Sequence, residues 1–246
     1  MGRCIVAGGK PDMVAPVAGI LASDLAVGST VKLMENGVAT EYLVINHGKP
    51  SGSSLYDDSC DGLWLLRKDI KENRQWHSSN VNDYQNSTIH AWLNGEFYNQ
   101  LGDIEKNSIK QVKIPYRAGS GNDRTVTSGE NGLSSKIFLL SPREVGIRSR
   151  DQNSSINDGA KLDYFEYGLE SSALKKRKAL FDGEATDWWT RSPYIVSKGT
   201  YALAIAYTGN TAGTVSPTSS MGIRPALVLQ SNALFDKTTL LLKGVA

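Results

Sequence analysis

The sequence has little of the residues that most often carry metal or covalent chemistry, with only two cysteines and three histidines in 246 residues. Cys4 and Cys60 are too few for a disulfide framework. Neither lies in a CxxC or Cys/His spacing that would hold a metal ion. We therefore expect both to be ordinary reduced thiols, and we expect no metal and no cofactor.

The motifs of common enzyme classes are also missing. His47, His77 and His90 are scattered along the chain, and no HExxH, GxSxG or phosphate-loop pattern occurs. Asp57, Asp58 and Asp61 lack the spacing of a calcium loop. The sequence therefore predicts a protein without catalytic activity. The open alternative is an enzyme of unknown class in the polar loops, using the side chains of His77, Asp83 or Glu144.

Charge of one sign does not dominate, and long apolar runs are absent. The chain has 27 basic and 25 acidic residues, for a net charge of +2. Such a balance gives no long-range field for nucleic acid, so we expect no nucleic-acid partner. The basic run Lys175 to Lys178 is typical of a solvated helix face. The mildly apolar stretch from Met13 to Ala26 is interrupted by proline, glycine and aspartate. We expect no membrane insertion and no signal peptide, hence synthesis in the cytoplasm.

The organisation predicted along the chain is one domain, residues 23–246, after an N-terminal arm or connector, residues 1–22. Hydrophobic residues make up 40% of the chain, which is enough for a real core. Apolar positions of helical spacing follow Ser87, which can cap a helix from Thr88 to about Leu101. A second short helix is predicted around Ile104 to Val112, and a third, basic one from Ser171 to Leu180.

Short strands separated by long loops complete the prediction. Asn36-Gly37 is the strongest hairpin signal in the chain. Because strands do not alternate with helices, the pattern favours an α+β fold with antiparallel pairing and long irregular loops. The predicted strands are Val31–Met34, Glu41–Ile45, Trp64–Arg67, Lys136–Leu140, Asp187–Ser192, Tyr201–Tyr207, Ile223–Leu229 and Leu240–Leu242.

Two blocks near the C-terminus are the most distinctive features of the sequence. In Asp187-Trp188-Trp189-Thr190-Arg191-Ser192-Pro193, neighbouring tryptophans on a strand face opposite sides, so at least one must enter the core. A buried indole N–H then needs an acceptor. In Gly222-Ile223-Arg224-Pro225-Ala226-Leu227, an arginine among apolar residues is expected to form a fixed hydrogen-bond fork. We therefore interpret Trp188, Trp189, Arg191, Arg224 and Pro225 as scaffold.

These blocks resemble the signature WWxRSP…GxRPAL of bacterial and phage proteins with a C-type lectin-like fold. They are similar to the variable proteins of diversity-generating retroelements, such as phage tail receptor-binding proteins. The resemblance covers roughly residues 23 to 236. Further upstream segments that carry it are Leu63–Arg67, Trp76–Asn80, Ser87–His90, Val112–Tyr116 and Lys136–Ser141. It implies a C-type lectin-like fold with a variable binding face. The family's oxidoreductase branch uses paired cysteines, and no cysteine follows Cys60.

In the diversified proteins, mutagenesis at adenines of asparagine codons yields small, hydroxyl and tyrosine residues, but never Lys, Glu, Gln, Trp or Met. The segment from Gly199 to Ser220 contains none of those five and no charged residue. An ordinary hairpin with a small-residue loop would show the same composition, since strands and turns disfavour Lys and Glu. The resemblance implies a variable ligand-binding face made of Tyr194, Ile195, Ser197, Thr200, Tyr201, Ala202, Ala204, Ala206, Tyr207, Thr208, Asn210, Thr211, Thr214 and Ser216.

The function expected from the sequence is therefore binding of a ligand or receptor. The partner would be a cell-surface protein or glycan, and the protein a phage tail component or a released extracellular adhesin. A homo-oligomer, such as a trimer, is compatible with this role. The open alternatives are the enzyme described above and a structural particle component whose C-terminal face is buried between subunits.

Overall fold

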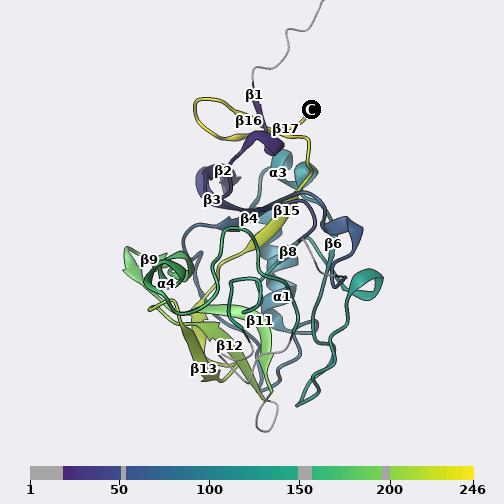
Figure 1. Cartoon of the computed structure of the whole chain (residues 1–246), viewed down its shortest axis with the longest axis vertical. Coiled ribbons are helices and arrows are strands. Elements are labelled where there is room, and N and C mark those ends of the chain that lie inside the picture. The colour runs from purple at the N-terminus through teal and green to yellow at the C-terminus, as the bar shows by residue number, and fades with distance from the viewer. Residues whose placement is uncertain (1–18, 51–53, 149–156, 196–199) are drawn as a thin grey trace, which may run out of the picture.

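The computed structural model describes residues 19–50, 54–148, 157–195 and 200–246, without the side chains of residues 212–214. The molecule is elongated, with β1, β16 and β17 at the upper end and β11, β12 and β13 at the lower end of Figure 1. Ordered structure begins earlier than the predicted Ser23, because Gly19–Leu21 forms strand β1 and pairs with β16 (Ala233–Asp236). Ala22, the last residue of the predicted arm, begins a 3-10 turn, and residues 1–18, which include Cys4, lie outside the described residues.

The central sheet is antiparallel throughout, in the order β2-β3-β4-β15-β8. The predicted hairpin is confirmed, since Asn36 and Gly37 join its first two strands with φ of 48° and 78°. Positive φ at both central residues gives a two-residue turn whose twist matches the right-handed twist of the two strands that it joins. Its strands are β2 (Thr30–Glu35), β3 (Val38–His47), β4 (Leu63–Arg67), β15 (Ala226–Leu229) and β8 (Ile137–Phe138).

The lower sheet has the order β13-β12-β11-β14-β5, with β11 in its centre. Its pairs are antiparallel except β11 with β14, which run parallel where Trp188 faces Gly222. The strands are β5 (Asn73–Gln75), β11 (Trp188–Tyr194), β12 (Tyr201–Ile205), β13 (Thr211–Val215) and β14 (Ser220–Gly222). The smaller pairings join β16 with β17 (Leu242–Val245), β6 (Val112–Ile114) with β7 (Leu133–Ser135), and β9 (Leu180–Phe181) with β10 (Glu184–Ala185).

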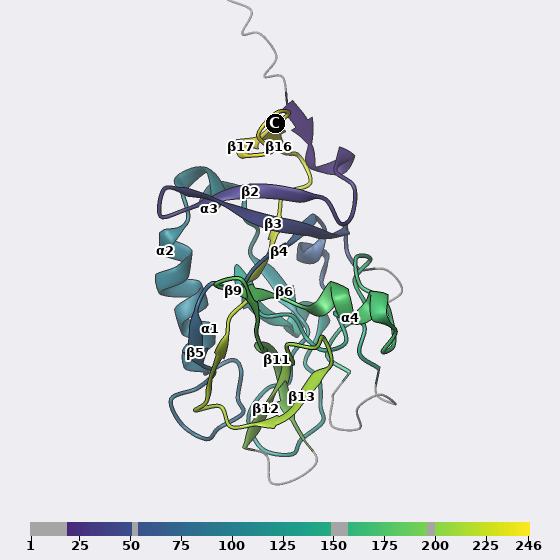
Figure 2. The same cartoon turned by 90° about the vertical axis from the view of Figure 1, so that its left-hand side faces the viewer.

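Short helices flank the sheets, with α1 and α2 along one side and α4 on the opposite side in Figure 2. Ser87 caps the predicted helix, because its Oγ accepts from the His90 N–H at 3.2 Å. The helix has a π-helical middle, which its apolar spacing does not reveal. The helical segments are α1 (Thr88–Trp92), the π-helix (Leu93–Phe97), α2 (Tyr98–Gln100), α3 (Asp103–Ser108), α4 (Ser171–Arg177) and the 3-10 turns Ala22–Asp24, Asp58–Cys60 and Gly129–Asn131.

Several predicted elements differ from the structure in extent. The third helix ends at Arg177, and Leu180, which we expected to end it, begins β9. The strands predicted at 201–207, 223–229 and 240–242 are Tyr201–Ile205, Ala226–Leu229 and Leu242–Val245. The second helix ends at Ser108, and Val112, which we expected within it, begins β6. The predicted strand at 136–140 pairs only over Ile137–Phe138, as β8 at the edge of the central sheet. Antiparallel sheets with a few short helices make the fold α+β, as the sequence predicts.

One hydrophobic core runs through both large sheets. Trp64 of the central sheet and Trp188 and Trp189 of the lower sheet are all fully buried in it. Burial raises the pKa of the Cys60 thiol to about 12, so this cysteine packs as a small apolar residue. The same cluster of buried residues therefore packs against both ends of the molecule.

Candidate ligand-binding surface

The two neighbouring tryptophans of β11 fix the lower sheet from both of its faces. Both side chains are fully buried. The Trp188 indole donates to the carbonyl of Arg177, at the end of α4, at 2.9 Å. The Trp189 indole donates to the carbonyl of Arg74, in β5, also at 2.9 Å. One tryptophan therefore anchors α4 and the other anchors the edge strand β5.

Arg191, in β11, forms a buried ion pair with Glu144, which lies in the loop after β8. Its Nη1 and Nη2 donate to the two Glu144 carboxylate oxygens at 2.5 and 2.8 Å, and both side chains are inaccessible to solvent. The same guanidinium donates to the carbonyls of Pro115, Leu139 and Asp158. All five guanidinium hydrogens are thus directed at protein acceptors, so Arg191 is a structural centre.

Asp158 borders this centre. Its Oδ2 accepts a hydrogen bond from the Ser192 hydroxyl at 2.5 Å, and its Oδ1 has no partner within the described residues. Burial raises its pKa to about 6, although the Arg191 charge and the Ser192 hydrogen bond oppose this shift. The carboxylate of Asp158 is therefore a costly group to hold ionised in the folded protein.

Arg224 and Pro225 join the lower sheet to the central one. The Arg224 Nε and Nη2 donate to the carbonyls of Arg67 and Lys68 at 2.9 and 3.0 Å. Burial lowers the pKa of Arg224 to about 10. The Arg67 N–H donates to the Pro225 carbonyl at 2.9 Å. The structure thus places an arginine fork where the sequence predicts one.

The stretch that we expected to form one variable face is divided by burial. Ile195, Ala202 and Ala204 are buried, and so are Leu203 and Ile205, which alternate with the two alanines along β12. A buried side chain cannot contact a ligand in this conformation, so these alanines belong to the core. Their burial also explains why β12 carries no charge. Ser197 and the side chain of Thr214 lie outside the described residues.

The exposed residues of the stretch lie at opposite ends of β12. Thr200 and Tyr201 are at its start, whereas Tyr207, Thr208 and Asn210 follow its end. A five-residue strand separates these groups by roughly 17 Å. Ala206 and Thr211, beside the second group, are half-buried.

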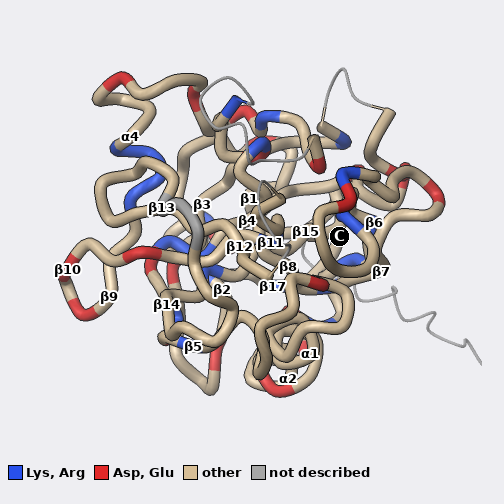
Figure 3. The backbone as a smooth tube through the Cα atoms, turned by 90° about the horizontal axis from the view of Figure 1, so that it is seen from below, with Lys and Arg blue, Asp and Glu red and all other residues tan. Residues whose placement is uncertain are grey.

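The second group is held against α4. The Tyr207 N–H donates to the Asp187 Oδ1 at 2.7 Å, and the Gly209 carbonyl accepts from the Arg177 Nε at 2.6 Å. A Cβ at Gly209 would lie 2.1 Å from the Leu174 carbonyl oxygen, which shows how closely this turn approaches α4. Seen from below, the basic positions of α4 lie to one side of β11, β12 and β13 (Figure 3).

The first group lies where loops from other parts of the chain converge. Tyr194 and Tyr201 are directly paired across β11 and β12. The buried Asn82 donates to the carbonyls of Tyr194 and Gly121, both at 3.3 Å. Its Oδ1 accepts from the buried Arg117 at 2.8 Å and from the Gly121 N–H at 2.9 Å. Asn82 therefore ties the loops after β5 and β6 to the end of β11.

A second set of hydrogen bonds fixes the loop after β13. The Ser216 hydroxyl donates to the Asn80 Oδ1 at 2.6 Å and lies 2.8 Å from the Thr218 hydroxyl. The backbone pairs as well, since the His77 N–H donates to the Pro217 carbonyl at 3.0 Å. We call the solvent-accessible side chains of this region the lower face, namely Tyr194, Thr200, Tyr201, Ser216, Thr218 and Asn80.

Sequence reasoning did not find Asn80, Asn82 or Arg117. Isolated asparagine and arginine residues in polar loops carry no periodic signal, and the partners that join these loops to β11 and to the loop after β13 are far away in the chain. The glycine-rich segment at Gly119 to Gly121 was the one available hint, because positive φ at both glycines lets the loop turn back toward Asn82.

The three side chains considered for an enzyme are each engaged locally or in the core. His77 Nδ1 accepts from the Ser79 N–H at 3.2 Å, and Asp83 Oδ2 accepts from the Asn86 side chain at 2.7 Å. Glu144 is bound to Arg191.

Within the described ranges, no group of three or more His, Cys, Asp and Glu side chains is placed to hold a metal ion. Every helix in these ranges is too short or too polar to span a membrane.

Comparison with known proteins gives one match. A family model described as a domain of unknown function, DUF6273, matches residues 61–231. The match covers both blocks of the scaffold, the loops that follow β5 and β6, and the whole lower face. No curated protein and no solved structure matches the chain.

Proposed function

We propose that this chain, which belongs to the DUF6273 family, is a binding protein without catalytic activity and contacts its partner through the lower face. The observation that carries the proposal is the cross-strand pair of Tyr194 and Tyr201, set among loops that buried hydrogen bonds hold in place. Adaptable surface residues on a rigid support are the usual arrangement of a binding site.

The chemistry of the lower face suits a neutral polar partner. Tyrosine offers a large contact area with few rotatable bonds, and serine, threonine and asparagine offer hydrogen bonds of either direction. None of the six side chains is charged. A cell-surface glycan or an uncharged protein surface is therefore the partner that this face matches best.

The finer part of the proposal is that the chain has a C-type lectin-like fold and is diversified by a retroelement, as a phage tail protein or surface adhesin. The two C-terminal blocks support it, as does the composition of the exposed positions. The buried positions of β12 do not add support, because burial alone accounts for their lack of charge.

Binding is tested with the full chain on an array of bacterial surface glycans and on intact bacterial cells. We expect retention of at least one glycan or cell type, with loss of at least tenfold in affinity for Tyr201→Ala. Such a loss corresponds to about 1.4 kcal/mol, ordinary for an interfacial tyrosine. Tyr167→Ala is the control, since Tyr167 is an exposed tyrosine outside the lower face. Equal binding by both variants, or no retained partner, contradicts the proposal.

Diversification is tested separately by reading the DNA around the gene. We expect a reverse transcriptase gene and a near-copy of the codons for residues 190–225, with mismatches confined to adenines. We expect these mismatches at exposed positions of the lower face such as Thr200 and Tyr201, and none in the codons of the buried Ala202 and Ala204. Absence of the copy refutes diversification while leaving the binding proposal in place.

A further inference from the structure

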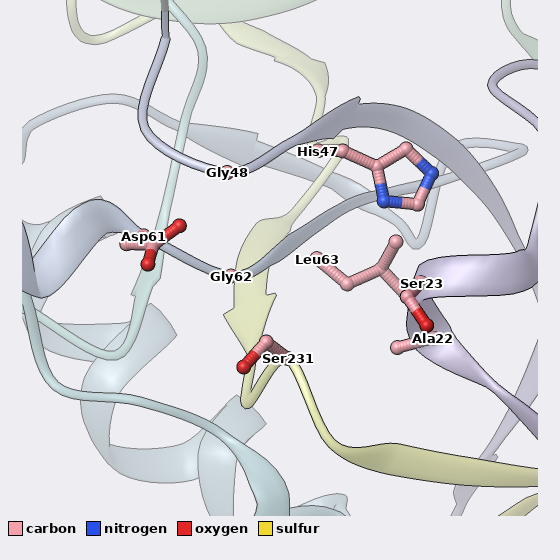
Figure 4. Close-up of a pocket in the computed structure, with 8 residues that line it drawn as sticks. All are labelled: Ala22, Ser23, His47, Gly48, Asp61, Gly62, Leu63 and Ser231. Carbon is pink, nitrogen blue, oxygen red and sulfur yellow. The ribbon is translucent and has the colours of Figure 1, made fainter.

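A small pocket lies in the upper half of the molecule, away from the lower face. Its volume is about 250 Å³. Three segments form it, namely the 3-10 turn after β1, the ends of β3 and β4, and the turn after β15. Figure 4 shows Asp61 at one side, His47 and Ser23 at the other, and Ser231 below. Four of the lining residues, Ala22, Ser23, His47 and Gly48, lie before residues 61–231, the region that the family model matches.

The floor of the pocket depends on two glycines. The Gly48 N–H donates to the Gly62 carbonyl at 2.8 Å, just beyond the last ladder pair of His47 with Leu63. A Cβ at Gly62 would lie 2.3 Å from the Leu229 carbonyl oxygen, and Gly48 has a φ of +67°. Glycine at these positions lets the strands end close together and leaves the space above them open.

His47 presents an acceptor to the pocket. Its Nε2 lies 2.7 Å from the carbonyl oxygen of Leu25. A carbonyl can only accept, so we assign the proton to Nε2. In the neutral ring the other nitrogen, Nδ1, is then an acceptor without a partner among the described residues.

Asp61 supplies the second strong acceptor. Its carboxylate makes no hydrogen bond and no ion pair within the described part of the chain, and the Lys110 ammonium binds the Asp61 backbone carbonyl instead. The Ser23 hydroxyl makes one long contact with Asp24, at 3.3 Å, and the Ser231 hydroxyl has no described partner. Asp61, Ser23 and Ser231 are exposed and His47 is half-buried, so the pocket offers an entering ligand a carboxylate, an imidazole acceptor and two hydroxyls.

The charge in the lining of the pocket favours a cation. Among the described residues that line it, Asp61 is the one acidic side chain, and no lysine or arginine lines it. Lys49, which follows the lining residue Gly48, is already paired with Asp58 at 2.6 Å. A ligand entering next to Asp61 meets a negative charge and acceptors that require donors.

We infer that this pocket binds a primary ammonium group on a short polar chain, with the ammonium beside the Asp61 carboxylate and a hydroxyl or amide hydrogen directed at His47 Nδ1. The volume admits a small amino alcohol or the end of a lysine side chain. The site is distinct from the lower face, so each can fail without the other.

The test is a titration of the full chain, followed by two-dimensional NMR of the backbone amides. The probes are ethanolamine for a free amine, N-acetyl-lysine amide for a lysine side chain, and ethylene glycol as the uncharged analogue. Asp61→Asn removes the charge without changing shape. Asp103→Asn is the matched control, because Asp103 is 96% exposed on α3 and does not line the pocket.

We expect saturable shifts of the Gly48 and Gly62 amides with one or both amines. We expect affinity at least tenfold weaker for Asp61→Asn and unchanged for Asp103→Asn. Saturation by ethanolamine alone identifies a free amine, and saturation by the lysine derivative alone identifies a polypeptide side chain. Shifts that never saturate, equal binding of ethylene glycol, or full binding by Asp61→Asn overturn the inference.

Discussion

At the residue scale, the buried charges explain most of how the lower end is held. The arginine fork at Arg224 could be predicted, because its apolar sequence neighbours imply burial and an arginine there must find acceptors. The partner of Arg191 could not be predicted. Glu144 is 47 positions away in the chain, and its local sequence is that of a polar turn. Only the folded chain brings the two together.

The Arg191–Glu144 pair gives a direct prediction of stability. Glu144→Gln keeps the shape of the side chain but leaves the Arg191 charge buried without a carboxylate. We expect the free energy of unfolding to fall by about 3–5 kcal/mol, measured by urea denaturation. Glu41→Gln is the control, since the exposed pair of Glu41 with Lys68 at 2.7 Å should contribute less than about 1 kcal/mol. Similar losses for both variants would show that the buried pair of Arg191 with Glu144 stabilises the fold no more than an exposed pair does.

Asp158 predicts an unusual dependence of stability on pH. Its folded pKa of about 6 lies above its ordinary value of 3.8, so the folded state binds the proton more tightly. The stability it contributes is fully present below pH 3.8 and is lost as the pH rises through about 6. For the difference in unfolding free energy between wild type and Asp158→Asn, we expect a fall on the order of 3 kcal/mol across this window.

Urea denaturation of both proteins at a series of pH values measures this difference. Because the other titrating groups are the same in both proteins, their contributions to the pH dependence cancel in the difference. A difference that stays flat or rises with pH would mean that Asp158 is ionised in the fold at little cost.

At the element scale, the sequence predicts best where local pattern decides the structure. Apolar spacing after Ser87 predicts the helix, and Asn36-Gly37 predicts the hairpin, because both signals are confined to a few neighbouring residues. Strands β5 and β14 were missed. Each is three residues long and carries no alternating apolar pattern, and their pairing with each other is set by the tertiary fold.

Two glycines offer a matched pair of element-scale predictions. An added Cβ meets nothing within 4 Å at either Gly37 or Gly95, so the two sites differ in backbone conformation alone. Gly37 has a φ of +78°, and Gly37→Ala should destabilise by about 1 kcal/mol. Gly95 lies inside the helix, and Gly95→Ala should stabilise by about 0.5–1 kcal/mol. Thermal unfolding of the wild type and both variants measures the sign of each change in stability. The same sign for both would contradict this account of the two elements.

At the scale of the whole molecule, the α+β class follows from the sequence, but the shape of the candidate surface does not. The uncharged segment from Gly199 to Ser220 looks uniform in composition. In the fold it divides into the lower face, a buried strand and a turn held on α4. Small apolar and hydroxyl residues are compatible with either burial or exposure, so composition alone cannot separate these parts.

The division gives the most direct test of the central claim, that the lower face and not the whole segment binds the partner. Tyr201 and Tyr207 come from the same segment, are 36% and 58% exposed, and lie at opposite ends of β12. The measurement is the dissociation constant of Tyr201→Ala and of Tyr207→Ala for the glycan or cell type that the wild-type chain retains. We predict at least a tenfold loss for Tyr201→Ala and less than about a twofold change for Tyr207→Ala. A loss confined to Tyr207→Ala, or equal losses for both, would contradict the account.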